Sequence, residues 1–275
     1  MRIISWNVNG IRSMAMKDKN GIKSEIKNGI SEENGIKTLI NEYKPDVLCF
    51  QEIKTQNKID LEFLDFKYIL INAAIKKGYS GVALLTNTKP EWVSYDMGES
   101  VESVESVELE SFMTEGRIIT ARFRDVVIVT VYVPNSQDEL ARLKDRLKWE
   151  DQLRNYLKVL KKENAVPIVL CGDLNIAPEE IDIHDPKGKK MTAGFSTVER
   201  AEFKKLIEVG FVDSFRYLHA DAKYTYWSNF HKAREKNKGW RIDLALVSDK
   251  DKICAADCLT DFKGSDHCPI LLELK

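Results

Sequence analysis

The sequence predicts an α/β sandwich, in which helices cover stacked β-sheets. Short segments rich in β-branched and apolar residues recur along the chain and end at glycine or polar residues, as strands do. Fewer, longer segments between them have the apolar periodicity of helices. The strands outnumber the helices and do not alternate with them regularly, so the pattern favours packed sheets over a βαβ succession.

Nine segments are predicted to be strands, because each is a run of apolar and β-branched side chains with polar or glycine residues at its ends. In chain order they are residues 3–6, 47–50, 68–72, 81–86, 118–122, 126–132, 167–170, 242–247 and 270–274. No linker separates these segments, so we expect residues 1–275 to form a single domain.

Helices are predicted over residues 36–43, 138–163 and 196–209 from their apolar spacing. Ser196 and Glu199 form a capping-box pattern at the start of the third. Two other stretches of biased composition, residues 16–35 and 99–111, are predicted to be surface insertions. The second contains three Ser-Val-Glu triplets, whose period of three fits neither a helix face nor a strand face.

The formal net charge of −1, from 42 Lys plus Arg and 43 Asp plus Glu, argues at first against a nucleic-acid-binding protein. The charges are unevenly distributed, however. Deleting residues 99–111 would remove five acidic residues and no basic one, which changes the formal charge from −1 to +4. Lys232, Lys236 and Lys238 lie between Phe230 and Trp240, a pattern that suits a phosphate backbone, although a solvated loop would look the same.

Several features favour a reducing compartment and exclude a membrane protein. The five cysteines form no CxxC pair, the apolar runs are far shorter than the ~20 residues of a membrane span, and no secretory signal opens the chain. We therefore expect an intracellular protein, cytoplasmic or nuclear, without a membrane partner, a disulfide framework or a zinc cluster.

Carboxylates, amides and one imidazole lie directly beside the predicted strands. Any one of them could be an ordinary turn residue. Strand ends that lie side by side in a sheet would instead gather them in one cleft, as in an active site. The residues concerned are Asn7, Glu52, Asn135, Asp173, Asn175, Asp266 and His267.

These residue types suit phosphoester hydrolysis. Oxygen ligands without cysteine favour a hard cation, Mg²⁺ or Mn²⁺, over zinc. His267, next to Asp266, suits acid–base chemistry or stabilisation of a transition state. The sequence lacks the glycine-rich nucleotide-binding loops and the serine-hydrolase elbow. A metal, a base and a proton-bearing side chain together indicate a metal-dependent phosphoesterase.

At these residues the sequence resembles the exonuclease III family of class II apurinic/apyrimidinic (AP) endonucleases. Nine segments match family motifs in family order, over nearly the whole chain. They are Ile-Ser-Trp-Asn-Val-Asn-Gly-Ile-Arg at 4–12, Pro-Asp-Val-Leu-Cys-Phe-Gln-Glu-Ile-Lys at 45–54, Gly-Tyr-Ser-Gly-Val-Ala at 78–83, Glu-Gly-Arg at 115–117, Tyr-Val-Pro-Asn at 132–135, Gly-Asp-Leu-Asn-Ile-Ala at 172–177, Ala-Gly-Phe at 193–195, Gly-Trp-Arg-Ile-Asp at 239–243 and Gly-Ser-Asp-His-Cys-Pro at 264–269.

The resemblance implies a four-layer αββα sandwich of two packed mixed β-sheets flanked by helices. It also implies a Mg²⁺-dependent hydrolase of base excision repair, with Mn²⁺ as a substitute. Such an enzyme cuts duplex DNA 5′ to an abasic site and has 3′-phosphodiesterase and 3′–5′ exonuclease activity. The implied partner is duplex DNA with abasic sites or blocked 3′ ends, and we expect a monomer.

The resemblance also assigns roles to single residues. The implied metal ligands are Glu52, Asn7 and Asp266. The motif leaves open whether one or two metals act, and a second metal would bind at Asp173, Asn175 and His267. The implied catalytic residues are Tyr132, Asp173, Asn175, Asp243 and His267. Asp173 would orient or deprotonate the attacking water, and Asp243 would orient His267 as a buried aspartate orients a catalytic imidazole.

Contacts to DNA are implied at a further set of positions, namely Asn135, Lys77, Tyr79, Arg117, Tyr226, Phe230, Trp240 and Arg241. Tyr226 and Trp240 would wall the pocket for a flipped-out abasic sugar, and Phe195 is a further candidate for this wall. Flipping costs less where the base is missing. The alternative role of such aromatic residues is core packing.

Two other functions stay open. A phosphatase of inositol phosphates, or another phosphodiesterase of the same superfamily, would share Glu52 and the motifs at 173–175 and 265–267. The motifs at 132–135 and 239–241 favour DNA repair over this alternative. A catalytically inactive DNA- or protein-binding module would be expected to lack Glu52, Asp173 or His267, and all three are present.

Overall fold

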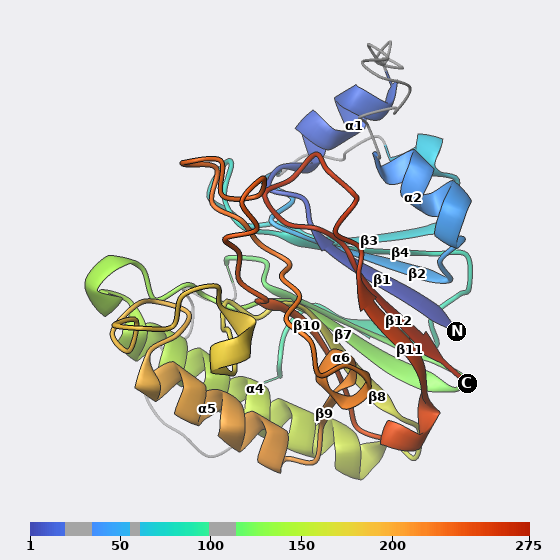
Figure 1. Cartoon of the computed structure of the whole chain (residues 1–275). Coiled ribbons are helices and arrows are strands. Elements are labelled where there is room, and N and C mark those ends of the chain that lie inside the picture. The colour runs from blue at the N-terminus through green and yellow to red at the C-terminus, as the bar shows by residue number, and fades with distance from the viewer. Residues whose placement is uncertain (20–34, 56–60, 99–113) are drawn as a thin grey trace.

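Two β-sheets pack face to face, and helices cover their outer faces (Figure 1). The structure is a computed structural model that describes residues 1–19, 35–55, 61–98 and 114–275. This arrangement confirms the predicted αββα sandwich. The proposed insertion at 99–111 lies outside the described residues, as do residues 20–34 of the insertion at 16–35.

Each sheet has six described strands, and its central pair is parallel: β1 with β2, and β7 with β8. The first sheet has the order β11 (Ile253–Cys258), β12 (Ile270–Leu274), β1 (Arg2–Asn7), β2 (Val47–Gln51), β4 (Val82–Thr86) and β3 (Tyr68–Asn72). The second has the order β5 (Trp92–Ser94), β6 (Ile118–Phe123), β7 (Val126–Tyr132), β8 (Ile168–Asp173), β10 (Asp243–Val247) and β9 (Val212–Asp213). All other neighbouring strands are antiparallel.

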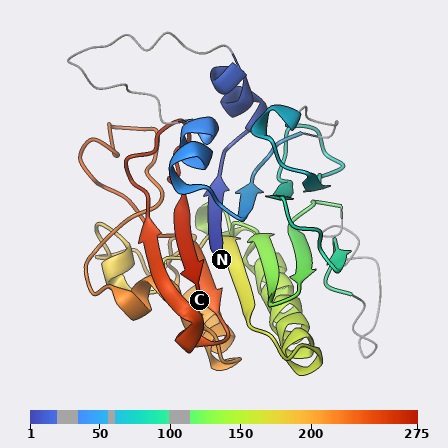
Figure 2. The same ribbon diagram turned by 90° about the vertical axis from the view of Figure 1, so that its right-hand side faces the viewer.

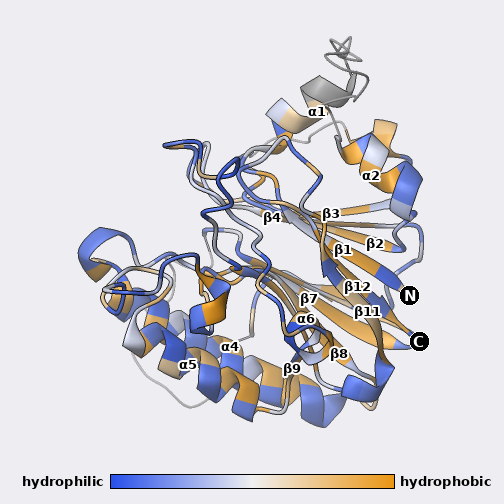
Figure 3. Cartoon of the chain, viewed as in Figure 1, coloured by the Kyte–Doolittle hydropathy of each residue, from blue (hydrophilic) through white to orange (hydrophobic). Residues whose placement is uncertain are grey.

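Alternating side chains build the layers. Ile3 of β1 belongs to the core between the sheets, whereas Ile4 packs in the core beneath the helices α1 (Ile11–Lys19) and α2 (Ile36–Tyr43). On the other sheet, α4 (Leu143–Glu163) and α5 (Thr197–Glu208) pack on outward-facing residues of β7, β8 and β10. Figure 3 shows the strands coloured as hydrophobic and the outer helices as amphipathic. The two termini lie side by side (Figure 2), where the N-terminal amine donates to the carbonyl of Leu274 at 2.7 Å.

All nine predicted strands are present, with ends shifted by at most a few residues. The helix predicted from residue 138 begins instead at Leu143, because Glu139 and Leu140 have positive φ and form a separate short turn, Asp138–Leu140. The short elements α1, β5, β9, β11 and α6 (Ser214–Leu218) were not predicted. None of the described helices has the length and apolarity that a bilayer crossing requires.

Candidate active site

The topology brings the polar strand ends to one edge of the sandwich. β1 and β2 are parallel and end at the paired residues Asn7 and Gln51. β7 and β8 likewise end at the paired residues Tyr132 and Asp173. β10 runs antiparallel to β8 and begins at Asp243, directly opposite Asp173. The carboxyl ends of the parallel strands therefore meet the amino end of an antiparallel neighbour at this edge.

Unusual backbone conformations aim the side chains at this edge. Gly172 has φ +142°, and a Cβ atom there would lie 2.0 Å from the carbonyl oxygen of Val131, so only glycine fits before Asp173. Glu52 and Asn175 have φ of 50° and 49°, values that residues with a side chain rarely adopt. Such strain persists where the surroundings fix it, and it concentrates at functional sites.

Asn7 links the two carboxylates of the cluster. It is completely buried, and its Nδ2 donates to Glu52 Oε1 at 2.9 Å and to Asp173 Oδ2 at 2.8 Å. Its Oδ1 accepts from the backbone N–H of Asn9 at 3.0 Å. Asn7 thus presents its amide nitrogen to the carboxylates, and its ligation of a metal stays a prediction.

His267 lies between two buried aspartates. Its Nδ1 donates to Asp243 Oδ2 at 2.8 Å, and its Nε2 lies 4.0 Å from Asp173 Oδ2. Burial alone would lower the pKa of His267, but the charge of Asp243 and this hydrogen bond raise it to about 10. The imidazole is therefore protonated at neutral pH and has its Nε2–H on the side of Asp173.

The two nearby carboxylates have pKa values shifted in opposite directions. Burial and the charge of Asp243 raise the pKa of Asp173 to about 7. Burial alone would also raise the pKa of Glu52, but the charge of Lys54 and the hydrogen bond from Asn7 outweigh it and lower the pKa. Glu52 is thus ionised at neutral pH, whereas Asp173 exchanges a proton near neutrality.

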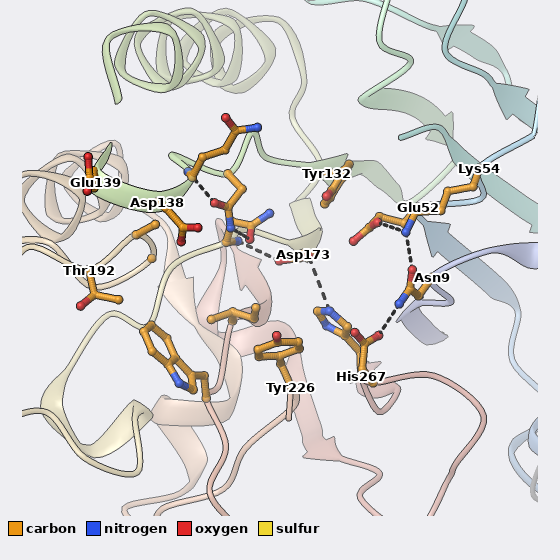
Figure 4. A pocket seen from close by; sticks show the side chains of 18 of the residues that line it. Asn9, Glu52, Lys54, Tyr132, Asp138, Glu139, Asp173, Thr192, Tyr226 and His267 are labelled. Atoms are coloured by element: carbon orange, nitrogen blue, oxygen red, sulfur yellow. Dashed lines mark hydrogen bonds and ion pairs between the residues drawn. The ribbon is translucent and has the colours of Figure 1, made fainter. Parts of the chain in front are cut away.

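A second series of polar contacts lies at the same edge of the sandwich (Figure 4). Lys54 Nζ lies 2.8 Å from Glu52 Oε2 and also contacts Asn9 Oδ1. Asn9 Nδ2 in turn donates to Asp266 Oδ1 at 3.0 Å. Lys54 and Asn9 therefore join the two predicted metal ligands Glu52 and Asp266.

Two asparagines and a tyrosine also line the cleft near Asp173. Asn135 Nδ2 donates to Asn175 Oδ1 at 2.9 Å, and the backbone N–H of Asn175 donates to Asp173 Oδ1 at 2.8 Å. Burial, with the charges of Glu52 and Asp173, raises the pKa of Tyr132 well above its ordinary value. The Tyr132 hydroxyl is therefore a permanent hydrogen-bond donor at neutral pH.

Glu52, Asp173 and His267 line a cleft of about 1020 Å³. In Figure 4, Glu52, Lys54 and Asn9 lie on one side of it, and Thr192 lies on the other with Asp138 and Glu139. The predicted wall residues Tyr226 and Trp240 both line the cleft, and the rings of Tyr226 and His267 are 4.9 Å apart. The cleft thus combines a charged centre with an aromatic wall.

Phe195 is not part of this wall. It is 2% exposed and packs edge-on behind Trp240, with ring centroids 6.4 Å apart. Among the other predicted DNA contacts, Lys77 is exposed, Tyr79 is half-buried and Phe230 is 75% exposed. All three lie outside the lining of the cleft, so their contacts with DNA stay predictions.

Two arginines predicted to contact DNA are buried in ion pairs. Arg241 is 1% exposed, and its guanidinium lies 2.7 Å from Asp182 and 2.7 Å from Asp213. Arg117 is 3% exposed and pairs with Glu115 at 2.5 Å. Both guanidiniums have carboxylate partners within the protein, and their contacts with DNA stay predictions. Their role in this structure is to hold the fold together.

The cluster fits a metal ion. Carboxylate oxygens of Glu52 and Asp173 and a ring nitrogen of His267 lie within 4.8 Å of one another. Asp266 lines the same cleft. Carboxylate oxygens at the centre of this set suit a hard divalent cation.

Sequence reasoning gave Lys54 no role in the site. Lys54 lies two residues after Glu52 and has no chemistry that singles it out. In the structure, the parallel pairing of β1 and β2 continues beyond Asn7, with the N–H of Gly10 bonded to the carbonyl of Glu52 at 2.8 Å. Residues 8–10 therefore had to lie beside residues 51–54.

Comparisons with known proteins agree with this geometry. A model of the Endonuclease/Exonuclease/phosphatase family matches residues 4–267. An exodeoxyribonuclease of Bacillus subtilis is 39% identical over 277 residues, which cover 99% of this chain and 98% of the relative. The DNA repair nuclease APEX1 of Danio rerio is 39% identical over 284 residues, 100% of this chain and 82% of the relative.

A solved structure gives the same result. The structure of an AP endonuclease from Archaeoglobus fulgidus has a TM-score of 0.79 at 26% identity, with 100% of this chain and 99% of that one covered. The likeness therefore extends over the whole chain.

Proposed function

The chain belongs to the endonuclease/exonuclease/phosphatase family, and from that premise we propose that it is a DNA-repair nuclease specific for abasic sites. It hydrolyses the phosphodiester 5′ to an abasic site in duplex DNA and removes blocking groups and nucleotides from 3′ ends. The observation that supports this best is the convergence of Glu52, Asp173 and His267 within 4.8 Å beside the aromatic wall of Tyr226 and Trp240.

Mg²⁺ is the cofactor in this proposal, with Mn²⁺ as a substitute. Glu52 and Asp266 would hold it, and Asn7 would fix the carboxylate of Glu52 through their 2.9 Å hydrogen bond. When bound, the cation supplies positive charge to the phosphoryl oxygens in the transition state.

The residues of the chain supply the remaining groups. Asp173, with a pKa of about 7, can take a proton from the attacking water at neutral pH. His267 is protonated and donates from Nε2 to a phosphoryl oxygen, while Asp243 fixes its ring. Tyr132 donates a hydrogen bond from its hydroxyl to a phosphoryl oxygen or to the leaving oxygen.

Asn135 and Asn175 complete the donor set. Asn135 Nδ2 uses one N–H for Asn175 Oδ1, and Asn175 Nδ2 uses one for the carbonyl of Val133. Because an amide nitrogen has two hydrogens, each residue retains one N–H for a phosphoryl oxygen. Donors fixed in this way before the reaction stabilise the charge that develops on the phosphate.

Tyr226 and Trp240 would hold the flipped-out abasic sugar. We further propose that the protein acts as a monomer inside the cell. All five cysteines are free and four of them are buried, which suits a reducing compartment.

The test is a substrate panel: abasic duplex, duplex with a 3′-phosphate, intact duplex and an inositol phosphate. The proposal predicts hydrolysis of the abasic duplex as the fastest reaction, with slower action on the blocked 3′ end. A protein that hydrolysed inositol phosphates and left abasic duplex intact would be the superfamily phosphatase instead. Binding of abasic duplex without hydrolysis of any substrate would indicate the inactive binding module.

A further inference from the structure

An ion pair outside the cleft lies at the junction of three segments that line it. Arg146 of α4 and Glu199 at the start of α5 are both fully buried, and Arg146 Nη1 lies 3.3 Å from Glu199 Oε1. The two helices run side by side under the second sheet (Figure 1). Neither residue lines the cleft.

Arg146 holds the backbone of the segment that contains Asp173. Its Nη1 donates to the carbonyl of Asn175 at 2.6 Å, and its Nη2 donates to the carbonyl of Leu174 at 3.0 Å. Asn175 has the strained φ of 49°, so this peptide needs external hydrogen bonds to stay in place. Arg146 provides two of them.

Glu199 holds the other two segments. Its Oε1 accepts a hydrogen bond of 2.6 Å from the hydroxyl of Ser136. Ser136 directly follows Asn135 in the chain. Its Oε2 accepts from the backbone N–H of Gly194 at 2.9 Å. Gly194 has φ +79°. It lies so close to Asn175 that a Cβ atom added to Gly194 would be 3.2 Å from the carbonyl oxygen of Asn175.

The pair thus joins segments 135–137, 173–175 and 192–195, each of which contributes residues to the cleft. We propose that Arg146 and Glu199 are positioning residues, which set the distance between the donors Asn135 and Asn175 and the part of the cleft lined by Gly194. This inference rests on the proposed function, because it assumes that those donors face a reacting phosphate. A misplacement of about 1 Å can reduce a rate by about 100-fold.

The chain contains a matched control pair. Arg154 and Glu202 also join α4 to α5, with Arg154 Nη1 2.6 Å from Glu202 Oε2, and their side chains are 11% and 12% exposed. Neither lines the cleft, and they form ion pairs with Asp151, Lys205 and each other. The two pairs therefore share the helices and the chemistry but differ in their links to the cleft.

The experiment compares Glu199→Gln and Arg146→Lys with Glu202→Gln and Arg154→Lys. Melting temperatures are measured first, and kcat and KM are then measured well below all of them. We expect all four variants to lose thermal stability. Only Glu199→Gln and Arg146→Lys should lose kcat, by about 100-fold and with little change in KM, because the donors are displaced while the DNA-binding surface is retained.

Equal kcat values for the Glu199 and Glu202 variants would overturn the inference. If Glu199→Gln does not fold, Ser136→Ala replaces it, since this change only detaches segment 135–137, and it should lower kcat to a smaller extent. The comparison is made on whichever phosphoester the wild-type protein hydrolyses fastest. If the wild-type protein did not hydrolyse abasic duplex, the proposed function would be contradicted. That outcome is distinct from equal kcat values of the Glu199 and Glu202 variants, which would contradict only the present inference.

Discussion

His267 has one ring nitrogen fixed in the protein and the other turned to the cleft. The fixed nitrogen, Nδ1, donates to Asp243, which is 1% exposed. Replacing Asp243 by Asn removes the charge that keeps the imidazole protonated and changes its hydrogen-bond partner. We expect Asp243→Asn to lower kcat by about 100-fold or more, because the corresponding change in other imidazole–carboxylate pairs has effects of this size or larger.

The measurement is a single-turnover rate on abasic duplex together with the dissociation constant of the complex. The dissociation constant should change little, since Asp243 does not line the cleft. Asp125→Asn, at an exposed turn, is the control. A wild-type rate for Asp243→Asn would show that His267 does not act as a protonated donor.

Asp173 is a second residue whose environment can be tested, through stability rather than rate. Burial and the charge of Asp243 raise its pKa from 3.8 to about 7 in the folded protein. A raised carboxyl pKa contributes stability that is fully present below 3.8 and is lost as the pH rises through about 7. Without metal, the wild type should therefore lose stability relative to Asp173→Asn between about pH 4 and pH 8.

This prediction is checked by thermal melts of both proteins in EDTA across that range. Titrating groups outside the cluster are common to the two proteins, so the difference between the melting temperatures reports on Asp173 together with His267, whose pKa the charge of Asp173 raises. A difference that stays constant with pH would show that Asp173 ionises in the folded protein as it does in the unfolded chain.

Among loops, the segment between Trp227 and Trp240 has a fixed base and an exposed tip. Arg234 stacks on Trp227 at 4.6 Å and donates to the carbonyls of Thr260 and Ser265, which anchors the base. Phe230, at 75% exposure, contributes little to the core. This arrangement suits an aromatic side chain that contacts DNA.

We expect Phe230→Ala to leave the melting temperature unchanged and to weaken binding of abasic duplex by about 10-fold, the usual scale for losing one base–aromatic contact. Binding is measured by fluorescence anisotropy, with Tyr217→Ala on α6, 49% exposed, as the control. Equal affinities of the two variants would remove Phe230 from the DNA interface.

The strands and the positions of the candidate catalytic groups at their ends were predictable because both depend on local patterns. An apolar run that stops at Asp173 or Glu52 identifies the strand and the side chain after it in one step. The start of α4 was not predictable, since residues 138–163 have helical periodicity throughout and only the positive φ of Glu139 and Leu140 interrupts it. Short elements such as β11 have mostly small residues and lack the apolar alternation that identifies a strand.

Arg241 shows why the DNA contacts were harder to predict than the catalytic groups. In the sequence it continues a basic stretch next to Trp240, which suggested a phosphate contact. In the structure its partners Asp182 and Asp213 come from elements 59 and 28 residues away. A charge neutralised by distant residues cannot be recognised from its neighbours in the chain.

The charge balance of the chain as a whole also affects DNA binding. Residues 99–111 contribute five acidic residues and no basic one. Deleting them should strengthen binding of duplex DNA at low salt, and the difference from the wild type should shrink as salt screens long-range repulsion. The check is a series of dissociation constants from low to high ionic strength. Identical values at every salt concentration would show that these charges do not reach the DNA.

The assignment of the Glu52, Asp173 and His267 cluster as the hydrolytic centre is tested most directly by mapping the cut in an end-labelled duplex with one abasic site. We predict a single Mg²⁺-dependent cut 5′ to that site, leaving a 3′-hydroxyl, which EDTA abolishes and Asp173→Asn slows by several orders of magnitude. Cleavage 3′ to the site, or a cut that survives both EDTA and Asp173→Asn, would contradict the assignment.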